Sequence, residues 1–378
     1  MSKSSSHHPQ VKETTSASSQ VQNLIVTEDE DGMRLDRWFK RRLPVLSLGH
    51  LNKIVRTGQV RVDGARAQIS TRLAAGMSVR VPPIKMETSV VARPALKRPS
   101  EHEHDLKTLR SMVLFEDKWV MALNKPYGLA VQGGSGTKHH IDGMLMAMAD
   151  EKGERPRLVH RLDRDTSGVL LVAKTRKIAA DLGEIFRTRQ TQKIYWSVVE
   201  GIPKPAQGRI SLFLAKGAGM GDERSPKARG AGREQARADL EKMRIAKHGD
   251  EDARHSVTFY ATVDKVAPRL AWLSMKPITG RTHQLRAHAQ AIGHPIIGDP
   301  KYTNELPAHD PRQTDPMRAI PREVERKLHL LARHLVLPHP KGGMIDVTAP
   351  LPPHMQKTFD LFGFDVHHYD PIVDAPDD

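Results

Sequence analysis

The amino-acid sequence predicts an α+β protein with two folded domains of unequal size. The chain has 378 residues, which is long for one compact domain and sufficient for two. Within residues 31–83, apolar residues first recur at helical spacing and then alternate with a period of two. Within residues 109–355, short strand-like runs alternate with a few helix-like segments. Helices and strands are therefore mixed in both parts of the chain.

The charge balance points to a polyanionic partner. The formal net charge is +15, and nucleic acid is the first candidate for such a basic chain. A membrane surface is the competitor, but no apolar run reaches the roughly 18 residues of a spanning helix. The absence of cysteine excludes disulfides, iron–sulfur clusters and thiolate zinc sites. We therefore expect a cytoplasmic protein with no membrane association, and nothing in the sequence indicates an obligate protein partner.

Composition also predicts the boundaries of the folded parts. Residues 1–22 are rich in Ser, Gln and Thr and are expected to be a disordered leader. Residues 84–108 mix Pro with charges of both signs and lack either regular period, which predicts a linker. Residues 356–378 are expected to be a loose acidic tail. Two candidate domains remain, at 23–83 and 109–355.

The smaller domain is predicted to hold two short amphipathic helices followed by strands. Apolar residues recur at i, i+3, i+4 from Leu35 and again from Leu51, and the sequence GQVRVDG then alternates. Its Asp-Gly pair predicts a tight turn into a second strand near residues 77–81. Residues 31–83 contain eleven Lys or Arg against three Asp or Glu. An ordinary solvated face rarely carries such an excess, so RNA binding is predicted.

The run RLDRWFKR…LNKIVRTGQVRVDG resembles the small RNA-binding domain that a small-subunit ribosomal protein shares with many RNA-modifying enzymes. In that family the two helices and the loop before the strand present basic side chains to structured RNA. The resemblance implies that Arg34, Arg37, Lys53 and Arg56 contact RNA. Asp36 is then expected to be a partner within the helix and not an RNA contact.

The larger domain contains two segments that bring polar side chains to one face. The strand-like KIYWSVVEG alternates so that Tyr195 shares a face with Ser197 and Val199 and can border a cleft. The segment RTHQLRAHAQAIG predicts a helix with Thr282 as its N-cap. On this helix His283, Arg286 and Gln290 share a face by i, i+3, i+7 spacing.

The stretch LVHRLDRDTSGVLLVAK, residues 158–174, places several charges before a strand-like run. A metal site at Asp163 and Asp165 is disfavoured because arginines interleave them and further carboxylates do not cluster nearby in sequence. A serine nucleophile at Ser167 would require a strand-to-helix elbow, and this segment leads into a strand instead. A polar turn explains Asp165 to Gly168 but leaves Asp163 without a role.

Three motifs in the same order, VHRLDRDTSG, KIYWSVVEG and KPITGRTHQLRAHAQAIGHPIIGDPKY, resemble the RluA-type pseudouridine synthases. NKPYGLAVQGGSGT and APLP fit the same family, so the resemblance covers nearly all of residues 30–355. With the basic N-terminal unit, the chain is most similar to the RluC-type branch that acts on large-subunit ribosomal RNA. The resemblance implies a catalytic domain with a mixed, mostly antiparallel sheet flanked by helices, and no metal or cofactor.

The resemblance also implies roles for four residues in isomerising uridine to pseudouridine. Asp163 would be the catalytic carboxylate, and Arg286 would hold it through a forked contact. Tyr195 would stack on the uracil, and its hydroxyl would move the C5 proton. Arg161, expected one pleat from Asp163 on the same side of a strand, would hold RNA after the nucleotide leaves the stack.

The sequence departs from the family pattern at two places. Leu331 stands where a histidine is expected, and the loop over residues 217–237 is longer than expected for a minimal member. Two alternatives within RNA biology remain open, a synthase that acts on transfer RNA and a ribosome-assembly factor that binds RNA without catalysis. A metal-dependent nuclease is a third.

Overall fold

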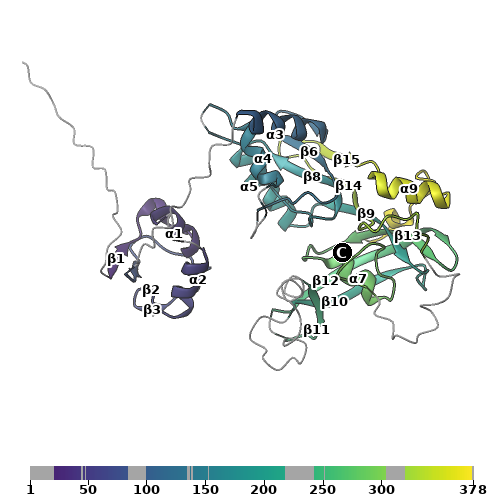
Figure 1. Cartoon of the computed structure of the whole chain (residues 1–378). Coiled ribbons are helices and arrows are strands. Elements are labelled where there is room, and N and C mark those ends of the chain that lie inside the picture. Colours follow the sequence, from purple (N-terminus) through teal and green to yellow (C-terminus); the bar gives the residue numbers. More distant parts are fainter. Residues whose placement is uncertain are drawn as a thin grey trace, which may run out of the picture. The chain divides into compact units, whose positions relative to one another are not determined.

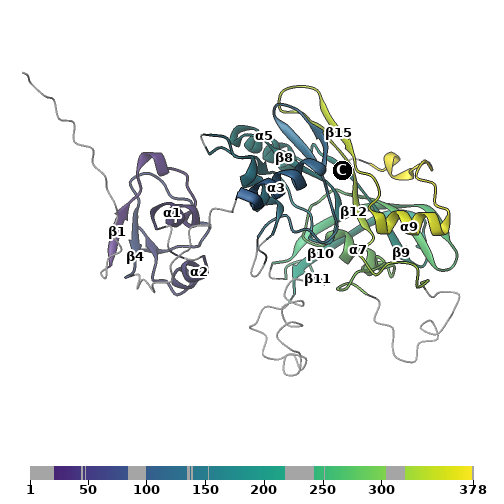
Figure 2. The ribbon, with the colours of Figure 1, turned by 45° about the horizontal axis from the view of Figure 1, so that its top comes forward.

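The computed structural model describes residues 21–43, 46, 48–83, 99–133, 137, 139–151, 153–217, 242–250, 252–303 and 320–376. The chain divides into two compact units, Met1–Leu96 and Lys97–Asp378, and Figures 1 and 2 show both. Most of the expected leader and the loop over 218–237 lie outside the described residues. Within the described ranges, no helix is long and apolar enough to cross a membrane.

The first unit is a small α+β domain built on a four-stranded antiparallel sheet in the order β1-β4-β2-β3. Both predicted helices form, and the apolar positions that their spacing identified are buried. The elements are β1 (Gln22–Ile25), η1 (Glu28–Glu30), α1 (Leu35–Arg42), α2 (Leu48–Arg56), β2 (Arg61–Val62), β3 (Ala65–Arg66) and β4 (Ser78–Val81). The buried side chains of the two helices are Leu35, Trp38, Phe39, Leu51, Ile54 and Val55.

A buried carboxylate fastens α1 to the start of this unit. Glu30 accepts hydrogen bonds from Nε1 of Trp38 at 2.9 Å and from Nε of Arg42 at 2.7 Å. These contacts, led by the Arg42 guanidinium, lower the pKa of Glu30 to about 2. The Arg42 guanidinium therefore has a structural role within the unit, and RNA binding is not needed to explain it.

The Asp-Gly turn leads to a different strand from the one predicted. Asp63 and Gly64 both adopt positive φ, which suits a two-residue hairpin turn, and the turn joins β2 to the two-residue strand β3. The strand predicted near residues 77–81 forms as β4 and pairs with the other edge of β2. Strand β3 was not predicted because two residues are too few to show a period.

The second unit is built on an eleven-stranded sheet, mixed and mostly antiparallel as the family resemblance implied. The main path runs β11-β10-β12-β13-β9-β14-β8-β6-β5, with β15 paired to β14 and β7 paired to β8. The contact between β14 and β8 is parallel, and the other described pairings in this sheet are antiparallel. The strands are β5 (Val113–Glu116), β6 (Val120–Lys125), β7 (Arg157–Leu158), β8 (Ser167–Ala173), β9 (Gln192–Glu200), β10 (Gln207–Lys216), β11 (Met243–Ala246), β12 (Arg254–Val266), β13 (Leu270–Pro277), β14 (Leu330–Pro338) and β15 (Met344–Thr348).

Helices flank this sheet at both of its ends (Figure 1). Helices α3, α4 and α5 lie near β6 and β8, whereas α7 packs against β10, β11 and β12. Thr175 caps α5 by accepting from the backbone N–H of Ile178. The helical elements are α3 (Pro99–Ser111), α4 (Ile141–Met144), η2 (Leu145–Met148), α5 (Arg176–Arg187), α7 (Gln284–Ala291), α9 (Pro353–Phe362) and η4 (Pro371–Asp374).

Helix α3 occupies part of the segment that was expected to be a linker. Residues 84–98 lie outside the described ranges, but α3 begins at Pro99 and packs against α4 and η2. Its inner face is narrow, with Asp105 and Leu109 buried one turn apart. Charged residues on the other faces conceal this stripe, so the sequence shows little helical periodicity.

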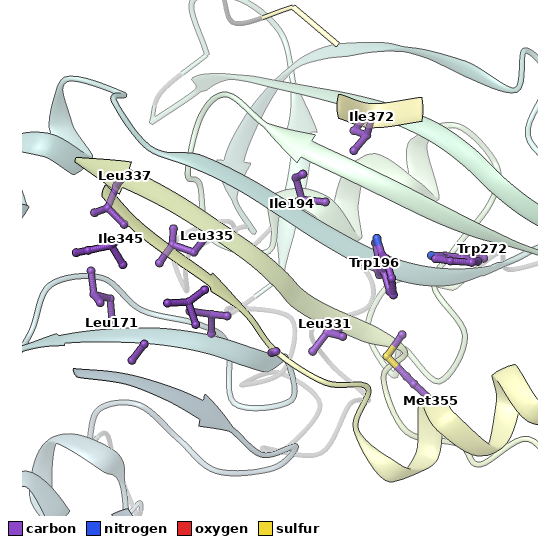
Figure 3. Packing of buried hydrophobic residues seen from close by; sticks show 14 of the residues in the cluster. Leu171, Ile194, Trp196, Trp272, Leu331, Leu335, Leu337, Ile345, Met355 and Ile372 are labelled. Atoms are coloured by element: carbon purple, nitrogen blue, oxygen red, sulfur yellow. The ribbon is translucent and has the colours of Figure 1, made fainter. Parts of the chain in front are cut away.

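The expected loose C-terminal tail is also structured, which corrects that prediction. Figure 3 shows Met355 of α9 close to Trp196 and Leu331 in the core, and Ile372 of η4 is buried as well. Asp370 accepts hydrogen bonds from Nε1 of Trp196 at 2.9 Å and from the Ser274 hydroxyl at 2.7 Å. The acidic composition was misleading because Asp370, one of these acids, serves as an internal acceptor.

Candidate active site

Asp163, Tyr195 and Arg286 come from three distant parts of the sequence and line one pocket. This inner pocket has a volume of about 120 Å³, and His283 and Leu330 also line it. Asp163 lies in the turn before β8, Tyr195 on β9 and Arg286 on α7. The structure therefore gathers the three residues that the family resemblance singled out.

A glycine fixes the position of the Asp163 turn against the centre of the sheet. Gly168 follows this turn in β8, with φ of 108° and its backbone against β14. A Cβ atom at this position would lie 2.2 Å from the carbonyl oxygen of Ala332. Only glycine permits this approach, which explains the last residue of the Thr-Ser-Gly sequence.

A buried lysine and a half-buried histidine support the same turn and the strand that follows it. The Lys125 ammonium donates to the carbonyl oxygens of Pro126, Leu129 and Arg164 at 2.7–2.9 Å, and burial lowers its pKa to about 7. The His160 Nε2 accepts from the backbone N–H of Leu171 at 2.8 Å. Burial, followed by the nearby Lys193 charge, lowers the pKa of His160 to about 3, so this imidazole is neutral.

Arg286 makes its forked contact with Asp299, which corrects the expectation that it grips Asp163. Its Nε and terminal nitrogen donate to the two Asp299 oxygens at 2.7 and 2.6 Å. Its other terminal nitrogen lies 3.8 Å from Oδ2 of Asp163, and Arg286 is 3 % exposed. Asp299 thus fixes the guanidinium, which then faces Asp163 as a pre-placed positive charge.

Asp299 is itself held by a close backbone approach. Gly298 has φ of 75°, and a Cβ atom there would lie 2.0 Å from the carbonyl oxygen of Lys327. The backbone N–H groups of Lys301 and Tyr302 donate to Oδ1 of Asp299 at 2.9 and 3.1 Å. The carboxylate is therefore saturated by four donors and available to Arg286 in one orientation.

Tyr195 lies between Met275 of β13 and Ala332 of β14 in the sheet register. Its ring lies on the face of β9 that also carries Val199, while Trp196 lies on the other face, as the alternation predicted. Burial, followed by the Asp163 charge, raises the pKa of Tyr195 well above its usual value. The phenol is therefore protonated at neutral pH and presents an O–H donor within the pocket.

The loop before α7 is closed by a glutamine instead of the predicted threonine cap. The side-chain oxygen Oε1 of Gln284 accepts from the Thr279 hydroxyl at 2.7 Å and from the backbone N–H of Arg281 at 3.0 Å. The N-cap position is His283, with φ of 51°, and not Thr282. A left-handed residue at a helix start has no signature in the apolar spacing, so the sequence analysis missed it.

The inner pocket opens into a larger cleft of about 660 Å³ that is lined by cations. The residues that line both spaces are Arg161, Lys193, Tyr195, Pro277, Thr279, Gly280 and Arg281. We call the larger space the cationic cleft, and its positively charged lining residues are Arg161, Arg187, Arg189, Lys193, Lys276 and Arg281. Within the described part of the chain, its lining includes no carboxylate. This space suits a polyanion that runs past the inner pocket.

Comparison with known proteins identifies the family of this chain. Residues 119–291 match the family model described as RNA pseudouridylate synthase. The chain is also 31% identical over 338 residues to the ribosomal large subunit pseudouridine synthase C of Vibrio vulnificus (strain CMCP6), covering 89% of this chain and 95% of that protein. This chain belongs to the RNA pseudouridylate synthase family.

Further relatives support the assignment of this chain to the family. The ribosomal large subunit pseudouridine synthase C of Escherichia coli (strain K12) is 32% identical over 335 residues, or 88% of this chain and 93% of that protein. The solved structure of human RNA pseudouridylate synthase domain containing 4 is 26% identical, with a TM-score of 0.52, and covers 69% of this chain and 96% of that one. The resemblance stated from the motifs is thereby confirmed, together with the fold class and the enzyme class.

The remaining predicted RNA contacts of the synthase are exposed. Arg34, Arg37, Lys53 and Arg56 lie on the surface of the first unit, and Arg34, at the N-cap of α1, forms an ion pair with Asp36 at 2.9 Å. In the second unit Arg161 is exposed at the mouth of both pockets. It does not lie on a strand as expected, because β7 ends at Leu158 and β8 begins at Ser167.

Sequence reasoning missed Asp299, Tyr302 and Lys125 as parts of the synthase site. Each acts through a neighbour distant in sequence, so spacing alone gives no signal. A buried arginine on a helix nevertheless requires a carboxylate partner, and GDPKY offers one inside a quoted motif. Leu331, the departure from the family pattern, is fully buried in the core, whereas its neighbour Leu330 lines the inner pocket.

Proposed function

We propose that this synthase converts uridines of large-subunit ribosomal RNA to pseudouridine, with Asp163 as the catalytic carboxylate. The observation that carries the proposal is the inner pocket, where Asp163, Tyr195 and Arg286 meet at the edge of a cationic cleft. The substrate class is supported by relatives that are named as synthases of the ribosomal large subunit. Because we propose ribosomal RNA as the substrate, we also propose that the protein acts in the cytoplasm.

The isomerisation breaks the bond between ribose C1′ and N1 of uracil and joins C1′ to C5. N1 gains a proton and C5 loses one, so the product has the same atoms as the substrate. The Asp163 carboxylate acts as the nucleophile or base of the first step, with the fixed Arg286 guanidinium 3.8 Å from its Oδ2. Tyr195 stacks on the freed uracil.

Tyr195 completes the reaction through its hydroxyl group. Because the phenol is protonated at neutral pH, it can accept the C5 proton only while it passes its own proton on. Asp163 is the nearby carboxylate whose charge acts on this hydroxyl, and it is the acceptor in our proposal. The proton therefore moves from C5 to the phenol oxygen as the phenol proton moves to Asp163, and Asp163 then gives its proton to N1, which completes the product and restores the carboxylate.

The cationic cleft holds the RNA strand on either side of the target nucleotide. The inner pocket is too small to admit duplex RNA, so the uridine must leave its stack to reach Asp163. Arg161 lies at the mouth shared by both spaces and neutralises a phosphate beside the flipped nucleotide. Exposed basic residues of the first unit, Arg37 and Lys53 among them, add affinity for the RNA without lining the inner pocket.

The Asp163→Asn variant tests the catalytic assignment. The amide has almost the same shape as the carboxylate but neither its charge nor its nucleophilicity, so we expect pseudouridine formation to fall by about a thousandfold or more. RNA affinity, measured by filter binding, should stay within about twofold because the cleft cations are unchanged. Near-normal single-turnover rates in the purified variant would refute the assignment of Asp163.

A pseudouridine map of RNA from cells with and without this gene tests the substrate. We expect signals to disappear from large-subunit ribosomal RNA and to return when the gene is restored, but not when the Asp163→Asn variant is supplied. Signals lost only from transfer RNA would contradict the substrate and leave the enzyme class intact. Full rescue of ribosome assembly by Asp163→Asn, with no change in modification, would favour a binding role.

A further inference from the structure

His283 starts α7 in a conformation that few residues other than glycine adopt. Its φ is 51°, in the left-handed region, and its side chain makes no capping hydrogen bond to the helix. Instead Nδ1 lies 3.1 Å from the Tyr302 hydroxyl and Nε2 lies 3.8 Å from Oδ2 of Asp163. Backbone strain of this kind persists where side-chain contacts hold it, and it is common in active sites. The imidazole therefore bridges a buried phenol and the proposed catalytic carboxylate.

The hydrogen bonds around Tyr302 fix which imidazole nitrogen carries the proton. The Tyr302 oxygen accepts from the backbone N–H of Met243 at 2.7 Å, so its own proton is free to be donated. Within the described residues, Nδ1 of His283 is its one recorded acceptor. If the hydroxyl donates to Nδ1, the neutral ring must carry its proton on Nε2, the nitrogen that faces Asp163.

Burial keeps this imidazole neutral. It lowers the pKa of His283, although the charges of Asp163 and Asp299 act in the opposite direction and those of Arg286 and Lys301 reinforce it. His283 therefore meets Asp163 as an N–H dipole and not as a second full cation beside Arg286.

Both neighbours approach the same carboxylate oxygen. Nε2 of His283 and the terminal nitrogen of Arg286 each lie 3.8 Å from Oδ2 of Asp163. That separation is too long for a hydrogen bond, but such contacts often tighten when substrate fills a site. With Oδ2 facing two donors, Oδ1 is the oxygen left for the substrate.

We propose that His283 is a positioning residue, whose Nε2–H orients Asp163 and directs Oδ1 toward the uridine. Tyr302 has the supporting part of fixing the imidazole tautomer. The inference rests on the proposed catalytic role of Asp163. This role explains why the backbone of His283 is held at positive φ, which the formation of α7 alone does not require.

Two substitutions of His283 separate this role from a backbone role, because they should have opposite effects. Asparagine tolerates positive φ well, but its short amide cannot reach Asp163. Glutamine is poorly suited to positive φ, but its amide N–H can extend about as far as Nε2 of histidine. If His283 positions Asp163, His283→Gln should retain most of the single-turnover rate at saturating RNA. His283→Asn should lose roughly tenfold or more, the equivalent of one hydrogen bond to a charged group.

Thermal unfolding and KM are measured on the same variants. The expected result is a lower unfolding temperature for His283→Gln than for His283→Asn, the reverse of their order in rate, with KM for RNA unchanged in both. Higher activity in the Asn variant than in the Gln variant, or equal rates in both, would overturn the proposal. A loss that appears only in KM would overturn it as well.

Tyr302→Phe provides a second variant that spares the His283 backbone. It keeps the buried ring beneath Arg286 but removes the hydroxyl that fixes the tautomer, so kcat should fall several-fold without a change in KM. Gln290→Ala is the matched control, because it removes a hydrogen bond to Thr303 from the same helix without touching Asp163. Unchanged kcat in folded Tyr302→Phe would contradict the tautomer argument.

The Asp163→Asn variant distinguishes failure of this inference from failure of the proposed function. If Asp163→Asn is inactive while both His283 variants match the wild type, the inference about His283 is wrong and the catalytic assignment remains. If Asp163→Asn is active, both are wrong.

Discussion

Arg286 and Asp299 form a buried, two-pronged ion pair 13 residues apart in sequence, with donor–acceptor distances of 2.7 and 2.6 Å. Arg286 is 3 % exposed and the Asp299 side chain is fully buried. A buried charge of this kind is stable only while its partner remains. Because the same guanidinium faces Asp163, this pair joins the stability of α7 to the electrostatics of the inner pocket.

Asp299→Ala should therefore reduce both stability and turnover. We expect the free energy of unfolding, measured with urea, to fall by about 3–5 kcal/mol, because Arg286 would be left as an unpaired buried charge. Asp250→Ala is a suitable control, since it breaks a largely exposed ion pair with Arg244 and should cost at most ~1 kcal/mol. A loss at Asp299 no larger than at Asp250 would show that water or another group replaces the partner.

Gly168→Ala should disrupt the junction of β8 and β14. The added methyl group would meet the Ala332 carbonyl at 2.2 Å in a residue with positive φ, so we expect a loss of at least ~2 kcal/mol in the free energy of unfolding. Gly183→Ala is the matched control, because Gly183 lies within α5 with no atom near its Cβ position. That change should stabilise the helix by about 0.5–1 kcal/mol. Equal effects at both positions would contradict the close approach.

The second unit should lose stability at mild acidity because it contains histidines that its fold keeps neutral. Burial lowers the pKa of His160 to about 3 and those of His288 and His329 to about 4, from an ordinary value of 6.5. Between these values the unfolded chain binds protons that the folded chain does not, so the free energy of unfolding falls as the pH drops below 6.5. Thermal unfolding at pH 7, 6 and 5 measures this effect.

The first unit should respond to acid at lower pH. Its Glu30 has a pKa lowered to about 2 by Arg42, so its stabilising contribution is complete above pH 4.5 and is lost as the pH falls toward 2.

His160→Gln, which retains an acceptor but does not titrate, should reduce the acid sensitivity of the second unit alone. An unfolding temperature that is constant from pH 7 to 5 would contradict the prediction for the histidines.

Product formation should not require a metal ion or other cofactor. The prediction comes from the family resemblance and from the proposed chemistry, in which the electron pairs and protons are handled by Asp163 and Tyr195. The enzyme is treated with excess chelator and assayed on RNA whose fold has been verified under the same conditions. Loss of activity that magnesium or zinc restores would return a metal-dependent mechanism to consideration.

The sequence was sufficient to predict features that depend on local periodicity. The apolar spacing identified the buried faces of α1 and α2, and alternation separated Tyr195 from Trp196 across β9. The three residues of the inner pocket came from motif resemblance, because no local pattern links positions 163, 195 and 286. Their gathering is a consequence of sheet order.

Features that depend on long-range partners were beyond the sequence. Arg286 was assigned to the wrong carboxylate because two aspartates were available, and the distinction requires the close backbone approach at Gly298 that presents Asp299. The C-terminal segment was expected to be loose because its acids suggest solvent. Asp370 instead accepts from Trp196 and Ser274, which lie about 100 residues or more earlier in the chain.

The central place of β14 determines when this enzyme becomes competent during its synthesis. In the sheet β14 separates β8 from β9, although β8 and β9 are neighbours in sequence and β14 begins only at Leu330. Asp163, before β8, and Tyr195, on β9, therefore belong to two half-sheets that are joined by a strand translated more than a hundred residues later. A nascent chain that lacks β14 has both chemical groups but no shared site. Modification of RNA must await translation of β14.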